Sequence, residues 1–284
     1  DTYFVDNAGD RVVESSGGGH DLVWSSVSYI LGSQIEDLSL NGFSAIDGAG
    51  NALDNRLTGN DYANVLDGKA GADTMIGQGG NDIYLVDNAG DSVIELAGQG
   101  FDEVRSTVSF RLDEEIEALK LMGSAKIDGV GNRLANTLTG NAAGNLLDGR
   151  SGNDTLSGEA GNDVLIGGLG LDRMTGGTGS DRFVFQAAAD TGTFSWTADV
   201  ISDFSRAQKD KINLSALDGN TDLAGKQGLS FIGSGAFSGA GQVRTDTGSG
   251  SSWIYVNLDE DLTDYEMLIN LTGEMTLKTG DFLL

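Results

Sequence analysis

The chain has 284 residues, of which 21% are charged, and its formal net charge is -26 at pH 7. Carboxylates in such excess repel one another and oppose a compact state unless a cation belongs to the folded protein, and they disfavour nucleic acid and anionic membranes as partners. The absence of cysteine excludes disulfides and thiolate metal sites, and the single histidine argues against zinc. We therefore expect any bound metal to be a hard cation held by oxygen. No stretch approaches the length of a membrane span, so membrane insertion is not expected.

The first half of the chain is duplicated. The segment Tyr3–Glu14 (YFVDNAGDRVVE) matches Tyr84–Glu95 (YLVDNAGDSVIE) at a shift of 81 positions, and the shift holds without a gap through a long block. Each copy begins with alternating apolar residues, which favour short strands, and its Asn-Ala-Gly-Asp stretch is a turn signal. Asp1 aligns with Asp82, the last aspartate of a repeat, so we expect this chain to be a fragment cut from a longer array.

A nine-residue repeat follows in each copy, in register from 50 to 85 and from 131 to 184. In Gly158–Ile166 (GEAGNDVLI), glycine occupies positions one and four, aspartate position six and leucine position eight. Glycine permits positive φ values and lets carbonyl oxygens approach a common centre. Since 81 is nine nonapeptides, the duplication copies whole rungs of a solenoid. Side chains alternate along a strand, so position eight points inward. The predicted core is a single file of apolar side chains that includes Leu156, Leu165, Met174 and Phe183.

The aspartates at position six are the predicted metal ligands. Two nonapeptides per turn place residues 18 positions apart on adjacent rungs, about 4.8 Å from each other. Asp154 then stacks on Asp172, and Asp163 on Asp181. Paired carboxylates are destabilising alone and favourable around a divalent cation, and backbone carbonyls complete the six to eight oxygens that calcium accepts. Magnesium suits such a carbonyl-rich loop less well.

The full set of predicted calcium ligands extends through both arrays, and we expect several Ca²⁺ ions. Pairs in which asparagine replaces one aspartate are further candidates. Position-one glycines are included because their backbone approaches the ion. The predicted metal-site residues are Asp154, Asp163, Asp172, Asp181, Asp73, Asp82, Asn55, Asn64, Asn136, Asn145, Gly149, Gly158, Gly167 and Gly176.

The nonapeptide resembles the calcium-binding repeat of the RTX (repeats-in-toxin) proteins. After Phe185 the period stops, and Asp199–Phe204 (DVISDF), Phe237–Arg244 (FSGAGQVR) and Thr279–Leu284 (TGDFLL) resemble the C-terminal domain of serralysin-type metalloproteases and other RTX exoproteins. The resemblance implies a secreted, extracellular protein exported by a type I secretion apparatus, with an uncleaved signal in the last few dozen residues. The HExxH zinc helix of the protease is absent from this chain.

We therefore expect an all-β chain, in which two duplicated parallel β-roll blocks precede a β-rich domain that caps them and carries the secretion signal. The expected segments are a strand-rich unit at 1–49, a first array at 50–86, a second strand-rich unit at 87–130, a second array at 131–185 and the serralysin-like domain at 186–284. Asp199 and Asp203 are candidates for closing the last rung.

The leading functional hypothesis is a non-catalytic module of a bacterial exoprotein that folds on calcium binding after export. One alternative is a calcium-dependent adhesin that binds cell-surface or extracellular polysaccharide. Another is the tail of a secreted protease, lipase, glycosidase or epimerase. Acids that recur in both copies, such as Asp21 and Asp102, are expected in surface, turn or accessory calcium roles rather than as glycosidase carboxylates. For Trp24, Trp196 and Trp253, buried packing is favoured over sugar stacking.

Overall fold

The structure is a computed structural model that describes residues 1–284. It divides into two compact units, Asp1–Ile127 (unit 1) and Asp128–Leu284 (unit 2), and each is described by itself. The helices are two single-turn 3-10 segments in unit 2, η1 (Ala188–Asp190) and η2 (Thr279–Asp281). No helix has the length and apolar character needed to cross a membrane.

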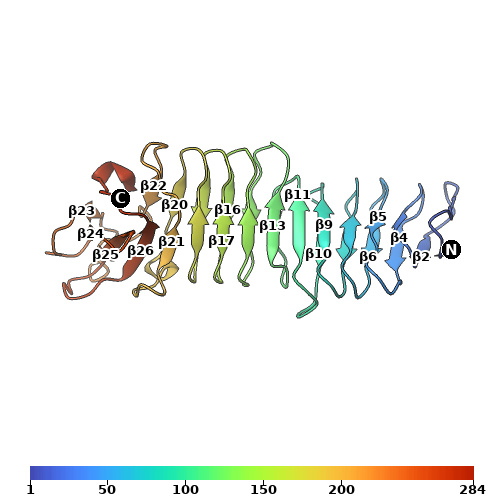
Figure 1. The fold of residues 1–284 in the computed structure, drawn as a ribbon, viewed down its shortest axis with the longest axis horizontal. Helices are drawn as coiled ribbons and strands as arrows, with labels where there is room; N and C mark the ends of the chain where they lie inside the picture. The colour runs from blue at the N-terminus through green and yellow to red at the C-terminus, as the bar shows by residue number, and fades with distance from the viewer. The chain divides into compact units, whose positions relative to one another are not determined.

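Unit 1 is a parallel β-solenoid whose short strands alternate between two sheets (Figure 1). One sheet has the order β1-β2-β4-β6-β8-β10, and the other, within this unit, has the order β3-β5-β7-β9-β11-β13. The strands are β1 (Thr2–Val5), β2 (Leu22–Ser25), β3 (Tyr29–Ile30), β4 (Asp37–Leu40), β5 (Gly48–Ala49), β6 (Arg56–Thr58), β7 (Val65–Asp67), β8 (Thr74–Ile76), β9 (Ile83–Val86), β10 (Ser92–Ile94), β11 (Glu103–Ser106), β12 (Phe110–Arg111) and β13 (Ala118–Leu121).

Unit 2 has the same two-layer arrangement, with the order β14-β16-β18-β20-β22-β27 in one sheet and β15-β17-β19-β21-β26-β25-β24-β23 in the other. The strands are β14 (Gly129–Val130), β15 (Thr137–Thr139), β16 (Leu146–Asp148), β17 (Thr155–Ser157), β18 (Val164–Ile166), β19 (Arg173–Thr175), β20 (Arg182–Val184), β21 (Asp199–Ile201), β22 (Lys211–Asn213), β23 (Ser230–Phe231), β24 (Gln242–Gly248), β25 (Ser251–Asn257), β26 (Met267–Thr272) and β27 (Phe282–Leu283).

The C-terminal strands of unit 2 extend both layers of the roll. Strands β24, β25 and β26 form an antiparallel meander, and β26 joins the roll by pairing in parallel with β21. The last strand, β27, pairs in parallel with β22 in the other layer. The all-β parallel roll predicted from the sequence is confirmed.

The core is a single file of apolar side chains in each layer. A three-residue strand directs only its middle residue inward, because side chains alternate along the strand. Leu156 pairs with Met174, and Leu165 pairs with Phe183, and all four are 0% exposed. Each such side chain contributes roughly 1.5 to 3 kcal/mol by leaving water. The inward direction predicted for position eight is confirmed.

The duplication is reproduced strand for strand, with the copy placed on the opposite layer. The shift of 81 positions converts β2 into β11 and β4 into β13, with identical bounds. Nine nonapeptides are an odd number of half-turns, so the prediction that the duplication copies whole rungs is wrong, and β2 and β4 lie in one sheet of unit 1 whereas β11 and β13 lie in the other.

The strand-rich segment and the array of unit 1 share one sheet, because β4 pairs with β6. The spacing between rungs is less regular in the strand-rich segment. Val23 pairs with Leu38, and Leu38 pairs with Leu57, whereas Leu57 and Met75 keep the separation of 18. The solenoid therefore tolerates rungs of unequal length.

The burial predicted for the tryptophans is wrong for two of them. Trp24 and Trp196 are 41% and 71% exposed. In β2, Val23 and Ser25 are the buried residues, so the alternation of side chains turns Trp24 outward. Trp196 lies outside the regular strands and stacks on Phe194, with ring centroids 5.0 Å apart.

Candidate metal centre

The position-six residues form a ladder along each roll. The Asp154 N–H donates to Asp172 Oδ1 at 2.8 Å, and the Asp163 N–H donates to Asp181 Oδ1 at 2.9 Å. Each donor lies 18 positions before its acceptor, as predicted for adjacent rungs. One carboxylate oxygen of each of these aspartates is therefore used to bind the backbone of the rung before it.

The second carboxylate oxygen of these rungs has no partner. Asp154, Asp163, Asp172 and Asp181 are 0 to 1% exposed. A buried polar atom without a hydrogen bond is rare in native proteins and calls for an explanation such as a bound ion. The predicted position-six aspartates with a buried, unpartnered Oδ2 are Asp73, Asp82, Asp154, Asp163, Asp172 and Asp181.

The position-one glycines leave room where these oxygens point. A methyl group in place of hydrogen on Gly158 would lie 2.5 Å from Asp163 Oδ2 and 2.6 Å from the carbonyl oxygen of Gly176. The carboxylate and the carbonyl of the next rung thus converge on one place that a Cβ would fill. The turn beside it needs positive φ at Glu159 and Gly161, with values of 70° and 125°. Gly149, Gly167 and Gly176 occupy the same position and meet their own rung's aspartate in the same way.

Burial disfavours the charged form of these aspartates. It raises the pKa of Asp154 and Asp163 to about 7 each, and that of Asp172 to about 6. In each case the N–H from the preceding rung lowers the pKa, and a nearby carboxylate raises it. Burial raises the pKa of Asp199 to about 9, and the Asp172 carboxylate adds to this rise. The file of carboxylates lacks positive charge.

The donor set fits calcium. A carboxylate oxygen and a carbonyl oxygen converge beside Gly158, and hard cations such as Ca²⁺ bind six to eight such oxygens. A divalent ion would offset the charge that burial disfavours, and it would give the unpartnered Oδ2 atoms a ligand.

The asparagine rungs of unit 1 are hydrogen-bonded differently. Asn55 Oδ1 accepts the Asn51 N–H at 2.7 Å, while its Nδ2 donates to the carbonyls of Ile35 and Glu36 at 3.0 and 3.1 Å. Asn64 Nδ2 likewise donates to the Ile46 carbonyl at 2.5 Å. A side-chain amide therefore binds backbone carbonyls in these rungs. The calcium role predicted for Asn55, Asn64, Asn136 and Asn145 stays a prediction.

The asparagine rungs also use the asparagine at position two, which is not among the predicted site residues. Asn51 and Asn60 accept the N–H two residues later and donate through Nδ2 to carbonyls of the preceding rung. In unit 2, Asn132 and Asn141 accept in the same way. The signal was present in the sequence as a Gly-Asn pair four residues before each position-six asparagine.

The ladder continues beyond the predicted ligands. Asp91 accepts the Asp73 N–H at 3.0 Å, and Asp210 accepts the Asp181 N–H at 3.0 Å. Asp91 lies 18 positions after Asp73 and could have been found by counting, but Asp210 lies 29 positions after Asp181, across a longer loop. Asp199 accepts the Asp172 N–H and Asp203 accepts the Gly176 N–H, each at 2.9 Å. The roll continues past them, since β21 pairs with β26 and β22 pairs with β27, so the role predicted for these two in closing the last rung stays a prediction.

The buried carboxylate ladder, the glycine turns and the apolar file together define a metal-binding parallel β-roll. Residues 49–84 match the RTX calcium-binding nonapeptide repeat (4 copies), and residues 138–284 match the family Peptidase M10 serralysin C terminal. This second match covers just over half of the chain. The protein is of the RTX type and belongs to the serralysin C-terminal family.

Solved structures similar to this chain include two subunits of a mannuronan C5-epimerase from Azotobacter vinelandii. The AlgE6R3 subunit is 27% identical, with 54% of this chain and 80% of that chain covered, at a TM-score of 0.41. The AlgE6R2 subunit is also 27% identical, with 56% of this chain and 92% of that chain covered, at a TM-score of 0.41. The comparison with curated proteins gave no match.

Proposed function

We propose that this chain is a non-catalytic module of a secreted bacterial exoprotein that folds on binding calcium after type I secretion. The observation that carries the proposal is the row of buried aspartate oxygens without partners along both arrays. In unit 2, the pairs Asp154 with Asp172 and Asp163 with Asp181 would hold ions, together with position-one carbonyls. In unit 1, Asp73 and Asp82 would do so. Bound calcium would supply the positive charge that these carboxylates lack.

The energetics make such a module a switch. Extracellular calcium modules have dissociation constants of about 10⁻⁴ to 10⁻³ M. Free calcium at about ten times that value stabilises the folded state by roughly 1.4 kcal/mol per site. Four sites would contribute roughly 6 kcal/mol, comparable to the net stability of a domain. Ligand binding and folding are then one event, and a calcium-poor cytosol would keep the chain expanded.

The position of the C-terminus supports export before folding. Asp281 is 6% exposed and accepts from Arg206 Nε at 2.9 to 3.0 Å, and Phe282 is 5% exposed in β27. A signal in these residues would be covered in the folded chain, so a secretion apparatus would have to read it in the unfolded one. Export of a reporter fusion that loses residues 281–284 should fall, whereas Arg206→Ala, which loosens only the folded tail, should leave export unchanged.

Circular dichroism during a calcium titration tests the proposal, with magnesium as the control. The chelated chain should be mostly unordered and should become β-rich with calcium, and magnesium should be much less effective. A chain that is already β-rich in excess chelator would contradict it. Asp163→Ala should raise the calcium midpoint, and an unchanged midpoint would count against this ligand set.

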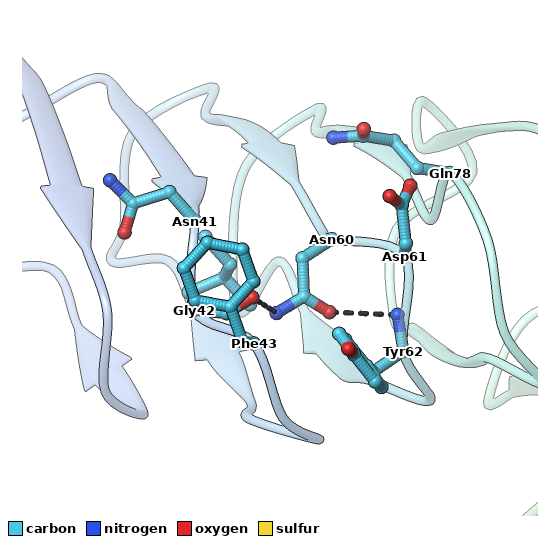
Figure 2. A pocket seen from close by; sticks show the side chains of 8 residues that line it. Asn41, Gly42, Phe43, Asn60, Asp61, Tyr62 and Gln78 are labelled. Carbon is cyan, nitrogen blue, oxygen red and sulfur yellow. Dashed lines mark hydrogen bonds between the residues drawn. The ribbon is translucent and has the colours of Figure 1, made fainter.

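A second candidate function is binding of neutral polysaccharide at a surface depression of unit 1. The depression has a volume of about 440 Å³ and is lined by Asn41, Phe43, Asp61, Tyr62 and Gln78 among others (Figure 2). Phe43 and Tyr62 are 93% and 43% exposed. Sugars stack on aromatic faces while amides and carboxylates bind their hydroxyls. The net charge of -26 favours a neutral glycan over an acidic one.

The duplication supports a binding role for the two aromatic residues. Ser124 and Ala143 occupy the equivalent positions in the second copy, so the fold does not need Phe43 or Tyr62. The buried Asn60 positions them, since its Nδ2 donates to the Gly42 carbonyl and its Oδ1 accepts the Tyr62 N–H, both at 3.0 Å (Figure 2).

Affinity electrophoresis against a panel of neutral polysaccharides tests this candidate. Phe43→Ser and Tyr62→Ala, which install the residues of the second copy, should abolish retardation without changing the calcium midpoint. Phe101→Ser is the matched control, because Phe101 is 50% exposed and does not line the depression. Equal retardation of all variants, or none with the wild type, would exclude this binding surface.

A further inference from the structure

The glycine pattern of the first array is interrupted after Gly77. A regular repeat would carry glycine again 18 positions later, but this chain has Glu95 there. A methyl group on Gly77 would meet Asp82 Oδ2, the Tyr84 hydroxyl and Glu95 Oε1, whereas at Gly158 it meets an aspartate and a backbone carbonyl. A side-chain carboxylate therefore takes the place that a carbonyl has in the regular rungs.

Three buried carboxylates meet at this point. Asp82, Glu95 and Asp102 are 1%, 7% and 1% exposed, and one oxygen of each lies within 4.8 Å of the other two. Asp102 Oδ1 accepts the Asp82 N–H at 2.8 Å, and Glu95 Oε1 accepts the Tyr84 hydroxyl. The remaining oxygens of Asp82 and Glu95 are buried without a hydrogen-bond partner.

A cation explains this arrangement better than hydrogen bonding within the protein. Arg105 is the nearest basic residue in the sequence, and it pairs with Glu103 instead. Burying one unpaired carboxylate is costly, and two like charges beside it increase the cost. Oxygen atoms are the only donors present, which suits a hard divalent ion.

We propose that Asp82, Glu95 and Asp102 form a distinct calcium-class cation site at the end of the first array, with the Tyr84 hydroxyl orienting Glu95. The site rests on the proposed function, because Asp82 is also a member of the aspartate file. It differs from the array sites in having three carboxylates, two of which, Glu95 and Asp102, come from outside the repeat. More ligand charge gives tighter calcium binding, so this site should fill first.

The duplication contains the same cluster a second time. Asp1, Glu14 and Asp21 precede Asp82, Glu95 and Asp102 by 81 positions, and their oxygens also lie within 4.8 Å of one another. The Tyr3 hydroxyl donates to Glu14 just as the Tyr84 hydroxyl donates to Glu95. In this copy Glu14 is only partly buried, whereas Glu95 is 7% exposed. Glu14 therefore provides a matched control in an open copy of the cluster.

The test uses the full chain with Ca²⁺ in isothermal titration calorimetry, and Tb³⁺ as a luminescent probe excited through tyrosine. Glu95→Gln keeps the side-chain shape and removes one ligand charge. It should weaken the tightest calcium site by at least about tenfold and reduce tyrosine-sensitised terbium emission. Glu14→Gln should leave the tightest site unchanged.

The outcomes separate this site from the array sites. An unchanged tightest site in Glu95→Gln, with a calcium site lost in Asp163→Ala, would overturn the tricarboxylate site and leave the proposed function standing. Absence of calcium binding in the wild type would overturn both. If Glu95→Gln does not fold, a terbium titration of the wild type provides the test. Tyrosine-sensitised emission should then saturate at a lower terbium concentration than the ellipticity does. Two coincident curves would exclude a site that fills before the others.

Discussion

Replacing Asp163 by asparagine should remove the negative charge of the side chain and keep the hydrogen bond that it accepts from the rung before it. Asp163 Oδ1 accepts the Asn145 N–H at 2.7 Å, and the buried Oδ2 has no partner. The asparagine carbonyl would keep the first bond, and its Nδ2 would face the Gly176 carbonyl in place of Oδ2. The amide of Asn55 already donates to backbone carbonyls in unit 1. Alanine at the same position removes the charge but also leaves the Asn145 N–H unsatisfied.

The wild type, Asp163→Asn and Asp163→Ala should respond differently to calcium. An unsatisfied buried group costs about 1 to 3 kcal/mol, so asparagine should stabilise the calcium-free fold by about that amount relative to aspartate. Calcium binding stabilises the folded wild type by roughly 1.4 kcal/mol when free calcium is tenfold above the dissociation constant, and by about 2.7 kcal/mol at a hundredfold excess. The advantage of asparagine should shrink, and can invert, as calcium rises. Alanine should remain about 1 to 3 kcal/mol below asparagine throughout.

Urea unfolding followed by circular dichroism at stepwise calcium concentrations measures these differences. Asp163→Asn should be more folded than the wild type in chelator and should bind one ion fewer by calorimetry. If Asp163→Asn is less stable than the wild type at every calcium concentration, chelator included, Oδ2 does not carry an uncompensated charge and the reasoning fails.

Three further perturbations follow from the same structure. Gly158→Ala should raise the calcium midpoint, because the new methyl group would lie 2.5 Å from Asp163 Oδ2, whereas Gly239→Ala has no atom within 4 Å and should leave it unchanged. Leu165→Ala should lower the free energy of unfolding, measured in urea at saturating calcium, by about 2 to 5 kcal/mol, since Leu165 is 0% exposed. A decrease no larger than that of Leu223→Ala, at an exposed position, would contradict the packed file of apolar side chains. In chelator, the carboxyl of Asp163 has a pKa of about 7 in the fold against 3.8 when exposed, so its contribution to stability is present at low pH and is lost as the pH rises through about 7. The chelated chain should therefore show more β-structure at about pH 5.5 than at about pH 8, and identical spectra would refute this linkage.

Much of the roll could be predicted from the sequence because its rules are local. Glycine at positions one and four fixes the turn, and the alternation of a three-residue strand fixes which residue points inward, as the burial of Leu165 and Met174 confirms. The contact between Asp154 and Asp172 could therefore be predicted from their separation of 18 positions alone.

The prediction failed where rungs depart from the period. Asp102 lies 20 positions after Asp82, and Asp210 lies 29 positions after Asp181, so counting nonapeptides does not find either contact. Trp196 follows the last repeat, where no alternation indicates whether a side chain is buried, and it is 71% exposed.

The coil, its inward side chains and the oxygen chemistry of its turns could be read from the chain of residues alone, since each follows from neighbours within one or two repeats. The folded arrangement was needed to see which carboxylate oxygens are left without a partner, and that Glu95 meets Asp82 and Asp102. Contacts between charged groups depend on how rungs of unequal length stack, and the packing of the whole unit determines that stacking.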